Sequence, residues 1–161
     1  MIRVQAEDFD VGAEIERLTS GKRHIGGVAT FLGLVRDIAK DKPVTAMTLE
    51  HFPGMTEKEL ARIEAEAQAR WPLDASLIIH RYGRLEPGDR IVFVATASAH
   101  RDAAFESCMF LVDYLKTQAP FWKLEEGDAG AAAWVEARES DDFARARWEA
   151  DSGLAKRVGP A

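Results

Sequence analysis

The segment RIVFVATASAHRDAAFESCMFLVDYLKT, which runs from Arg90 to Thr117, decides the fold. Its first nine residues are rich in β-branched and apolar types, which is typical of a strand with a buried face. From about Asp102 onward, apolar residues recur at intervals of three and four, the spacing of one helix face. They are Phe105, Cys108, Met109, Val112 and Leu115. The segment therefore predicts a strand over Arg90–Ser98 and then a helix over Asp102–Thr117, with those five residues as its buried stripe.

The rest of the chain shows the same two periodicities. The predicted elements are a strand over Ile2–Gln5, a helix from the N-cap Asp10 through Leu18, a strand over Gly26–Arg36, a polar loop over Arg36–Pro43, a strand over Val44–Phe52, a helix from a Thr56/Glu59 capping box to Trp71, a strand over Leu77–Leu85, a turn over Glu86–Asp89, a strand over Ala132–Ala137 and a helix over Asp141–Trp148. The predicted buried stripe of the helix that ends at Trp71 is Leu60, Ile63, Ala67 and either Trp71 or Ala69. Helices and strands mix without strict alternation, which predicts an α+β fold with a mainly antiparallel sheet and packed helices. Residues 1–148 are predicted to form one domain, and 149–161 a flexible tail.

The stretch YLKTQAPFWK, Tyr114 to Lys123, sets Lys116 and Lys123 on either side of an apolar group of residues. Pro120 ends the helix by about Ala119, because the residue before a proline is pushed out of the helical region. The plain interpretation is a helix end followed by a tucked-in loop. The sharper one is a pocket wall from which two cations project.

Composition excludes several classes of function. The 161 residues carry a formal charge of −6, which argues against a nucleic-acid partner because phosphate binding needs an excess of Lys and Arg. The apolar runs are too short to span a membrane, and the N-terminus lacks the apolar stretch of a signal peptide. A single cysteine excludes an internal disulfide, which agrees with a reducing, cytoplasmic location.

Familiar cofactor motifs are absent from the sequence. Gly21-Lys22 lacks the upstream glycine and the following Ser or Thr of a phosphate-binding loop. The four histidines show neither an HExxH motif nor paired Cys/His spacing, so we expect no metal site and no cofactor. Cys108 falls on the apolar stripe of its helix, where a cysteine is usually an inert small hydrophobe.

Five cationic residues fall at the ends of predicted elements: Arg36, His100, Arg101, Lys116 and Lys123. A helix N-terminus such as that after His100 already favours anions. Each residue also has an ordinary explanation, since Lys116 can complement the helix dipole, His100 can be a cap and Arg36 a surface charge. An anion site needs several of these groups to converge, which their positions in the sequence leave open.

Several longer motifs carry a resemblance to a known family. They are TLEHFPGMTEKEL (Thr48–Leu60), RWPL (Arg70–Leu73), PGDRIVFV (Pro87–Val94), SAHR (Ser98–Arg101), DYLKTQAPFWK (Asp113–Lys123) and WVEARESD (Trp134–Asp141). In this order, from about Val28 to Trp148, the chain resembles the large, catalytic subunit of molybdopterin synthase. The resemblance implies an α/β-hammerhead-like fold.

The resemblance also implies an activity and its partners. The expected enzyme is a sulfurtransferase of molybdenum cofactor biosynthesis, which moves two sulfurs onto cyclic pyranopterin monophosphate to form the molybdopterin dithiolene. The sulfur donor is a small ubiquitin-like subunit whose C-terminal Gly-Gly ends in a thiocarboxylate. The family assembles as a homodimer of large subunits within a heterotetramer. This chain ends in Pro160-Ala161 and is therefore unsuited to be the sulfur carrier itself.

Matching by position implies site residues. Lys116 and Lys123 correspond to the family's two active-site lysines and are the expected catalytic residues. The expected substrate-binding residues are Leu34, Val35, Arg36, His100, Arg101, Lys116, Lys123, Leu124 and Glu125. The family pattern often has basic residues where this chain has Leu34, Gln118 and Leu124, which weakens the expected attraction for an anionic substrate.

Two alternatives stay open. A non-catalytic scaffold of the same fold is one, although such a member would be expected to lose Lys116 or Lys123. An unrelated phosphate-ester enzyme using the same cations is the other, and it leaves the shared PGMTEK and APFWK segments unexplained.

Overall fold

The structure, a computed structural model, describes residues 1–39, 42–127, 132–134 and 139–150 of the chain. Its elements are β1 (Ile2–Gln5), α1 (Val11–Thr19), β2 (Gly27–Leu34), β3 (Ile38–Ala39), β4 (Lys42–Pro43), β5 (Ala46–His51), α2 (Met55–Arg70), β6 (Ala75–Arg81), β7 (Gly83–Leu85), β8 (Arg90–Ser98), α3 (Arg101–Thr117), β9 (Phe121–Glu126), β10 (Ala132–Trp134) and α4 (Glu139–Ala150).

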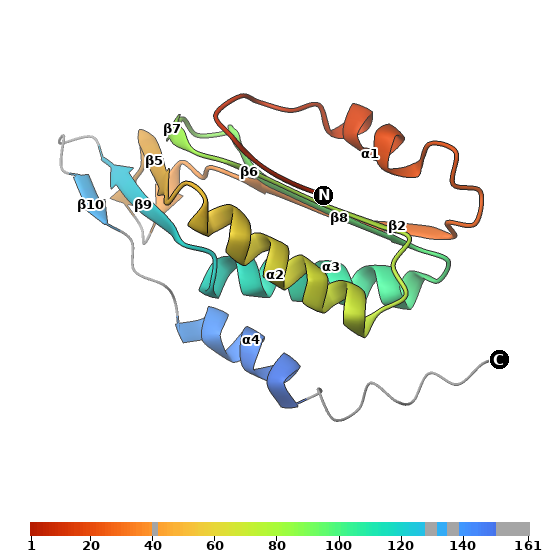
Figure 1. The fold of residues 1–161 in the computed structure, drawn as a ribbon. Coiled ribbons are helices and arrows are strands. Elements are labelled where there is room, and N and C mark those ends of the chain that lie inside the picture. The colour runs from red at the N-terminus through yellow and green to blue at the C-terminus, as the bar shows by residue number, and fades with distance from the viewer. Residues whose placement is uncertain (40–41, 128–131, 135–138, 151–161) are drawn as a thin grey trace.

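Two four-stranded sheets organise these elements. The first sheet has the strand order β1-β6-β8-β2, and the second has the order β10-β9-β5-β7. All pairs are antiparallel except β1 with β6. Helix α1 covers one face of the first sheet, α2 and α3 cover the other, and α4 lies beyond them (Figure 1). The predicted α+β class with a mainly antiparallel sheet is therefore confirmed.

Apolar clusters lie on both faces of the first sheet. On the α1 face, Phe9 and Leu18 pack against Leu77, Ile79 and Phe93. On the other face, the stripe predicted for α2 is confirmed, since Leu60, Ile63 and Ala67 are fully buried beside Phe110 and Leu111 of α3. Each fully buried Leu, Ile or Phe contributes about 1.5–3 kcal/mol, so these clusters hold helices and sheet together.

The start of α2 differs from the prediction. The helix begins at Met55 after Gly54, whose φ of 83° lets the chain turn directly behind Pro53. Glu57, rather than Glu59, accepts a hydrogen bond from the Gly54 N–H at 2.7 Å. Thr56 is not the cap residue and is buried in the first turn. The predicted Thr56/Glu59 capping box is therefore wrong.

The predicted strand Leu77–Leu85 is two strands. Gly83, with a φ of 91°, breaks it after Arg81, so that β6 belongs to the first sheet and β7 to the second. The loop predicted over Arg36–Pro43 also contains a short antiparallel pair, in which Ile38 lies opposite Pro43. Both errors arise because the apolar alternation in the sequence does not record where a strand changes sheet, and because a pair of two-residue strands is too short to show it.

The stripe predicted for α3 is partly wrong. Cys108, Val112 and Leu115 are buried, but Phe105 is 66% and Met109 50% exposed. The helix is covered from two directions, by the first sheet and by α2 with α4, so small and polar residues such as Ala104 and Ser107 lie inside instead. Because α4 extends to Ala150, it passes the predicted boundary at 148; residues 151–161 and 135–137 lie outside the described part of the chain.

Candidate functional site

The residues after Pro120 form strand β9 rather than the predicted loop. β9 pairs antiparallel with β5, so that Phe121 lies opposite His51 and Lys123 opposite Leu49. Alternate residues of a strand point to the same side, and Phe121 and Lys123 therefore share one face. Trp122 lies on the other face and is 46% exposed. Of the two aromatic residues between the lysines, only Phe121 packs against the apolar core.

Helix α2 holds the segment that joins α3 to β9. The hydroxyl of Thr56 donates to the Pro120 carbonyl at 3.2 Å and accepts from the Phe52 N–H at 3.1 Å. Arg62 donates to the side-chain oxygen of Gln118 at 2.6 Å. These contacts fix the chain between the helix that carries Lys116 and the strand that carries Lys123.

Lys116 lies exposed in the last turn of α3, and Lys123 lies exposed on β9. Only the fixed segment 118–120 separates the two elements. The interpretation of YLKTQAPFWK as a pocket wall with two projecting cations stays a prediction, since neither of the two hollows described below is lined by Lys116 or Lys123.

A buried histidine lies under the start of β9. The His80 ring stacks on Phe121 with 3.6 Å between ring centroids and 14° between planes. Burial lowers the pKa of His80 to about 4, although its hydrogen bond to the Arg81 backbone opposes the change and the charges of Lys123 and His51 add to it. His51 in turn packs against Tyr82 with 4.5 Å between ring centroids. Sequence reasoning missed this cluster, although a lone histidine inside the apolar run LIIHR was a signal of a buried ring.

Leu34, Val35 and Arg36 lie at the end of β2. Val35 is buried, its N–H donates to the Asp89 carbonyl at 2.9 Å, and its own carbonyl accepts from the Gly88 N–H at 2.9 Å. Leu34 and Arg36 are exposed, and Arg36 lines a surface hollow with Val35 and the turn at Gly88. Val35 also packs in one cluster with Leu49, the residue opposite Lys123. The Arg36 region and Lys123 therefore lie at the same end of the molecule.

His100 and Arg101 lie at the opposite end. His100 is the N-cap residue of α3 without a side-chain capping bond, and Arg101 begins the helix beside Asp102. The register pairs Gly27 with Ser98 at this end of β8 and Leu34 with Arg90 at the other. The ends of β8 are about 26 Å apart, since a strand rises about 3.3 Å per residue. Within one chain, Arg36 and Lys123 thus lie toward one end of β8, and His100 and Arg101 lie at the other.

The two remaining predicted residues lie on opposite faces of β9. Glu125 shares the face of Lys123, whereas Leu124 lies with Trp122 and is paired with Trp134 of β10. The Leu124 side chain therefore lies on the face of β9 opposite to that of Lys123.

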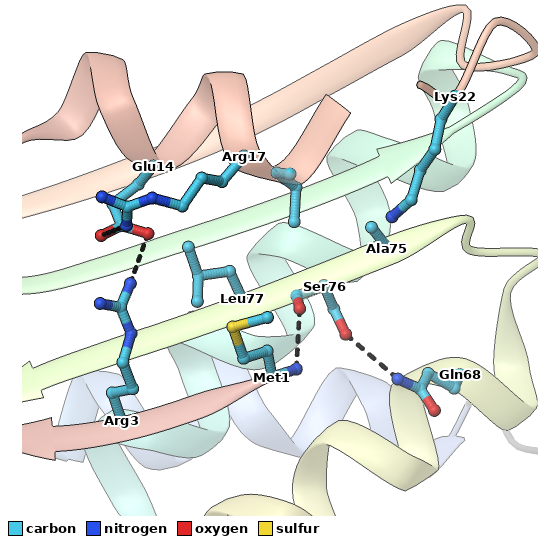
Figure 2. Close-up of a pocket in the computed structure, with 10 residues that line it drawn as sticks. Met1, Arg3, Glu14, Arg17, Lys22, Gln68, Ala75, Ser76 and Leu77 are labelled. Atoms are coloured by element: carbon cyan, nitrogen blue, oxygen red, sulfur yellow. Dashed lines mark hydrogen bonds and ion pairs between the residues drawn. The ribbon is translucent and has the colours of Figure 1, made fainter. Parts of the chain in front are cut away.

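A second hollow lies between α1, β1 and β6 (Figure 2). Arg3 and Arg17 both pair with the buried Glu14, the latter at 2.6 Å. The hydrogen bond from Arg3, more than that from Arg17, holds the Glu14 pKa below its usual value against the effect of burial. Since these arginines neutralise a carboxylate of the same chain, we interpret the cluster as structural.

Cys108 is buried, and burial raises the pKa of its thiol to about 11 while a hydrogen bond with Thr96 opposes this. A protonated, buried thiol is a poor nucleophile, which supports the expected inert role. Within the described residues no three His, Cys, Asp or Glu side chains gather where a metal ion would bind. No helix in the same part of the chain is long and apolar enough to cross a membrane.

Comparison with known sequences decides the family. A family model described as "MoaE protein" matches residues 4–118. The chain belongs to the MoaE family. One relative of this MoaE chain, from Ralstonia nicotianae, is named "Molybdopterin synthase catalytic subunit" and is 56% identical over 147 residues, 91% of this chain and 83% of that protein. A relative of the same name from Pseudomonas aeruginosa is 55% identical over 92% of this chain and 98% of its own length.

Solved structures give the same family and fold. The "Molybdopterin biosynthesis MoaE protein" of Burkholderia ambifaria has a TM-score of 0.79 and 53% identity over 92% of this chain and 97% of that one. The "Protein-protein complex of subunit 1 and 2 of Molybdopterin-converting factor" of Helicobacter pylori contains a chain with a TM-score of 0.68 and 17% identity, over 86% of this MoaE chain and 90% of that one. At that identity the second likeness shows the fold alone.

Proposed function

We propose that this chain is the catalytic subunit of a molybdopterin synthase, a sulfurtransferase of molybdenum cofactor biosynthesis. It transfers two sulfurs from the thiocarboxylated C-terminus of a small carrier subunit to cyclic pyranopterin monophosphate, forming the dithiolene. The observation that carries the proposal is the identity above 50%, over more than nine tenths of this chain, to relatives named for that role. The ordered placement of Lys116 and Lys123 supports it.

The chemistry brings anions together, and the two lysines offset their repulsion. A thiocarboxylate and a phosphate both carry negative charge, and two unit charges 4 Å apart repel by about 4 kcal/mol at a protein surface. Ammonium groups held in place lower that energy without having to reorganise during the reaction. Lys116 handles the carrier terminus and its acyl intermediate, and Lys123 assists proton transfer at the pterin.

The carrier partner and a homodimer belong to the same proposal. The relatives from Ralstonia nicotianae and Pseudomonas aeruginosa are named as a catalytic subunit, which is consistent with a separate partner subunit. His100 and Arg101 lie a strand length from Arg36 and the lysines. If all five cations contact one substrate, a second copy of the chain must therefore supply His100 and Arg101 to the site. A homodimer within a heterotetramer satisfies this requirement, because a two-fold axis supplies the same pair of residues to both sites.

The lysine variants test the catalytic proposal. The chain is mixed with thiocarboxylated carrier and cyclic pyranopterin monophosphate, and dithiolene product is measured over time. Lys116→Ala and Lys123→Ala should each lower the rate by at least about a hundredfold, the loss typical of a group that stabilises transition-state charge. Lys22→Ala, beside the structural ion-pair cluster, is the control and should match the wild type. Carrier binding without product in the wild type would favour the scaffold alternative.

Mixing two inactive variants tests the shared site. Arg101→Ala and Lys123→Ala chains are unfolded together, refolded and assayed. If each site takes Arg101 from one chain and Lys123 from the other, random pairing leaves about a quarter of the sites intact. Recovery of about a quarter of the wild-type rate is expected. A rate no higher than that of either variant alone would refute the shared site.

A further inference from the structure

His80 occupies the place where the two sheets meet. It lies in β6 of the first sheet, next to the break at Gly83 that sends the chain into the second sheet. Its ring is buried on the face covered by α2 and α3, and it stacks on Phe121, the first residue of β9. This stack is therefore a direct side-chain contact between the first sheet and the strand that carries Lys123.

The contacts of His80 fix both its orientation and its charge. Its Nδ1 lies 2.9 Å from the Arg81 carbonyl oxygen, and because a carbonyl can only accept, Nδ1 must carry the proton. The titratable groups that act on the ring from neighbouring strands are Lys123 of β9 and His51 of β5, and both lower the pKa of His80 further. The ring is therefore neutral at pH 7, so it adds no positive charge beside the Lys123 ammonium.

We infer that His80 is a positioning residue for Lys123, acting through its stack on Phe121. Phe121 and Lys123 are two residues apart on one face of β9, so a shift of the Phe121 ring moves the backbone that presents the ammonium. The contacts of Pro120 with α2 hold the segment before β9, and the stack holds its first residue. The inference rests on the proposed function for the catalytic role of Lys123. The position of the Lys123 side chain can be measured whether or not the proposed function holds.

Two substitutions separate the ring from its nitrogens. His80→Ala removes the stack, whereas His80→Phe keeps an aromatic ring against Phe121 and loses only the bond to the Arg81 carbonyl. A misplacement of about 1 Å can lower a rate about a hundredfold. His80→Ala should therefore lower kcat by at least about tenfold with KM for the pterin changed by less than about threefold. His80→Phe should restore kcat to within about threefold of the wild type.

A second readout does not depend on activity. Lysines are converted to ¹³C-dimethyl-lysine, which keeps the charge, and the NMR signal of Lys123 is assigned with Lys123→Arg. His80→Ala should shift or broaden this signal, and His80→Phe should leave it near the wild-type position. His24→Ala is the control, because His24 is an exposed histidine paired with Asp74 at 2.8 Å. Should His80→Ala fail to fold, Phe121→Ala takes its place.

The possible results divide cleanly. An unchanged Lys123 signal in folded His80→Ala overturns the inference, whatever the activity. The same holds if folded His80→Phe is as impaired as His80→Ala, because the ring would then matter less than its nitrogen. A shifted signal rescued by His80→Phe supports the positioning role even if the wild type makes no dithiolene, in which case the proposed function alone fails.

Discussion

Acidification below pH 6.5 should destabilise the protein through His80. The pKa of this ring is about 4 in the folded chain and 6.5 for an exposed histidine, because burial disfavours the charged form. Between these values the unfolded chain binds a proton that the folded chain does not, so the free energy of unfolding falls as the pH falls. The full contribution is about 3 kcal/mol, since each pKa unit corresponds to about 1.4 kcal/mol. About 2 kcal/mol of this is lost between pH 7 and pH 5.

Urea unfolding of the wild type and His80→Phe at pH 7, 6 and 5 measures this contribution. The difference between the two proteins isolates His80, because other groups titrate equally in both. Asp8 and Glu14 have lowered pKa values, chiefly through hydrogen bonds from Arg90 and Arg3 respectively, so their contributions are lost only at still lower pH. The wild type should lose about 2 kcal/mol more than His80→Phe from pH 7 to pH 5. If the free energies of unfolding of the two proteins fall equally between pH 7 and pH 5, His80 is not buried in its neutral form.

Two variants and one labelling experiment test other parts of the structure. Gly26→Ala should lower the free energy of unfolding by about 1–3 kcal/mol in urea, because its new Cβ would lie 2.2 Å from the Ala99 carbonyl oxygen; an unchanged midpoint would contradict this close approach. Asp113→Ala should lower the free energy of unfolding by about 3 kcal/mol, since both Arg147 and the buried Trp148 indole donate to this carboxylate at 2.8 Å. A loss below about 0.5 kcal/mol would show that the packing of α4 does not depend on Asp113. Cys108 should resist iodoacetamide at pH 8 in the folded protein and react once unfolded, because its pKa is raised to about 11, and rapid labelling of the folded chain would contradict its burial.

Periodicity predicted most of the fold. The stripe Leu60, Ile63 and Ala67 was visible because α2 buries a single face. The prediction that Phe105 is buried in α3 was wrong. That helix is covered from two sides, so the apolar spacing of a single helix face does not identify its buried residues. Strand β9 was missed because Pro120 and two aromatics hide the alternation, and because its partner β5 lies about seventy residues earlier.

The candidate site was only partly predictable. Lys116 and Lys123 stand out by their spacing around Pro120, and Arg36, His100 and Arg101 stand out as cations at the ends of predicted elements. The resemblance added Leu34, Val35, Leu124 and Glu125. Neither the sequence spacing nor the resemblance gives distances in space. The separation of His100 and Arg101 from Arg36 therefore becomes visible only in the register of β8 with β2. His80 was passed over because its importance lies in packing against Phe121, which no sequence motif records.

The stoichiometry of sulfur transfer tests the proposed function most directly. The chain is incubated with excess thiocarboxylated carrier and limiting cyclic pyranopterin monophosphate, and product and spent carrier are counted by mass spectrometry. The account predicts molybdopterin dithiolene, with about two carriers converted from thiocarboxylate to carboxylate per product, since each carrier delivers one sulfur. Bound carrier that stays thiocarboxylated, with no dithiolene formed, would contradict it.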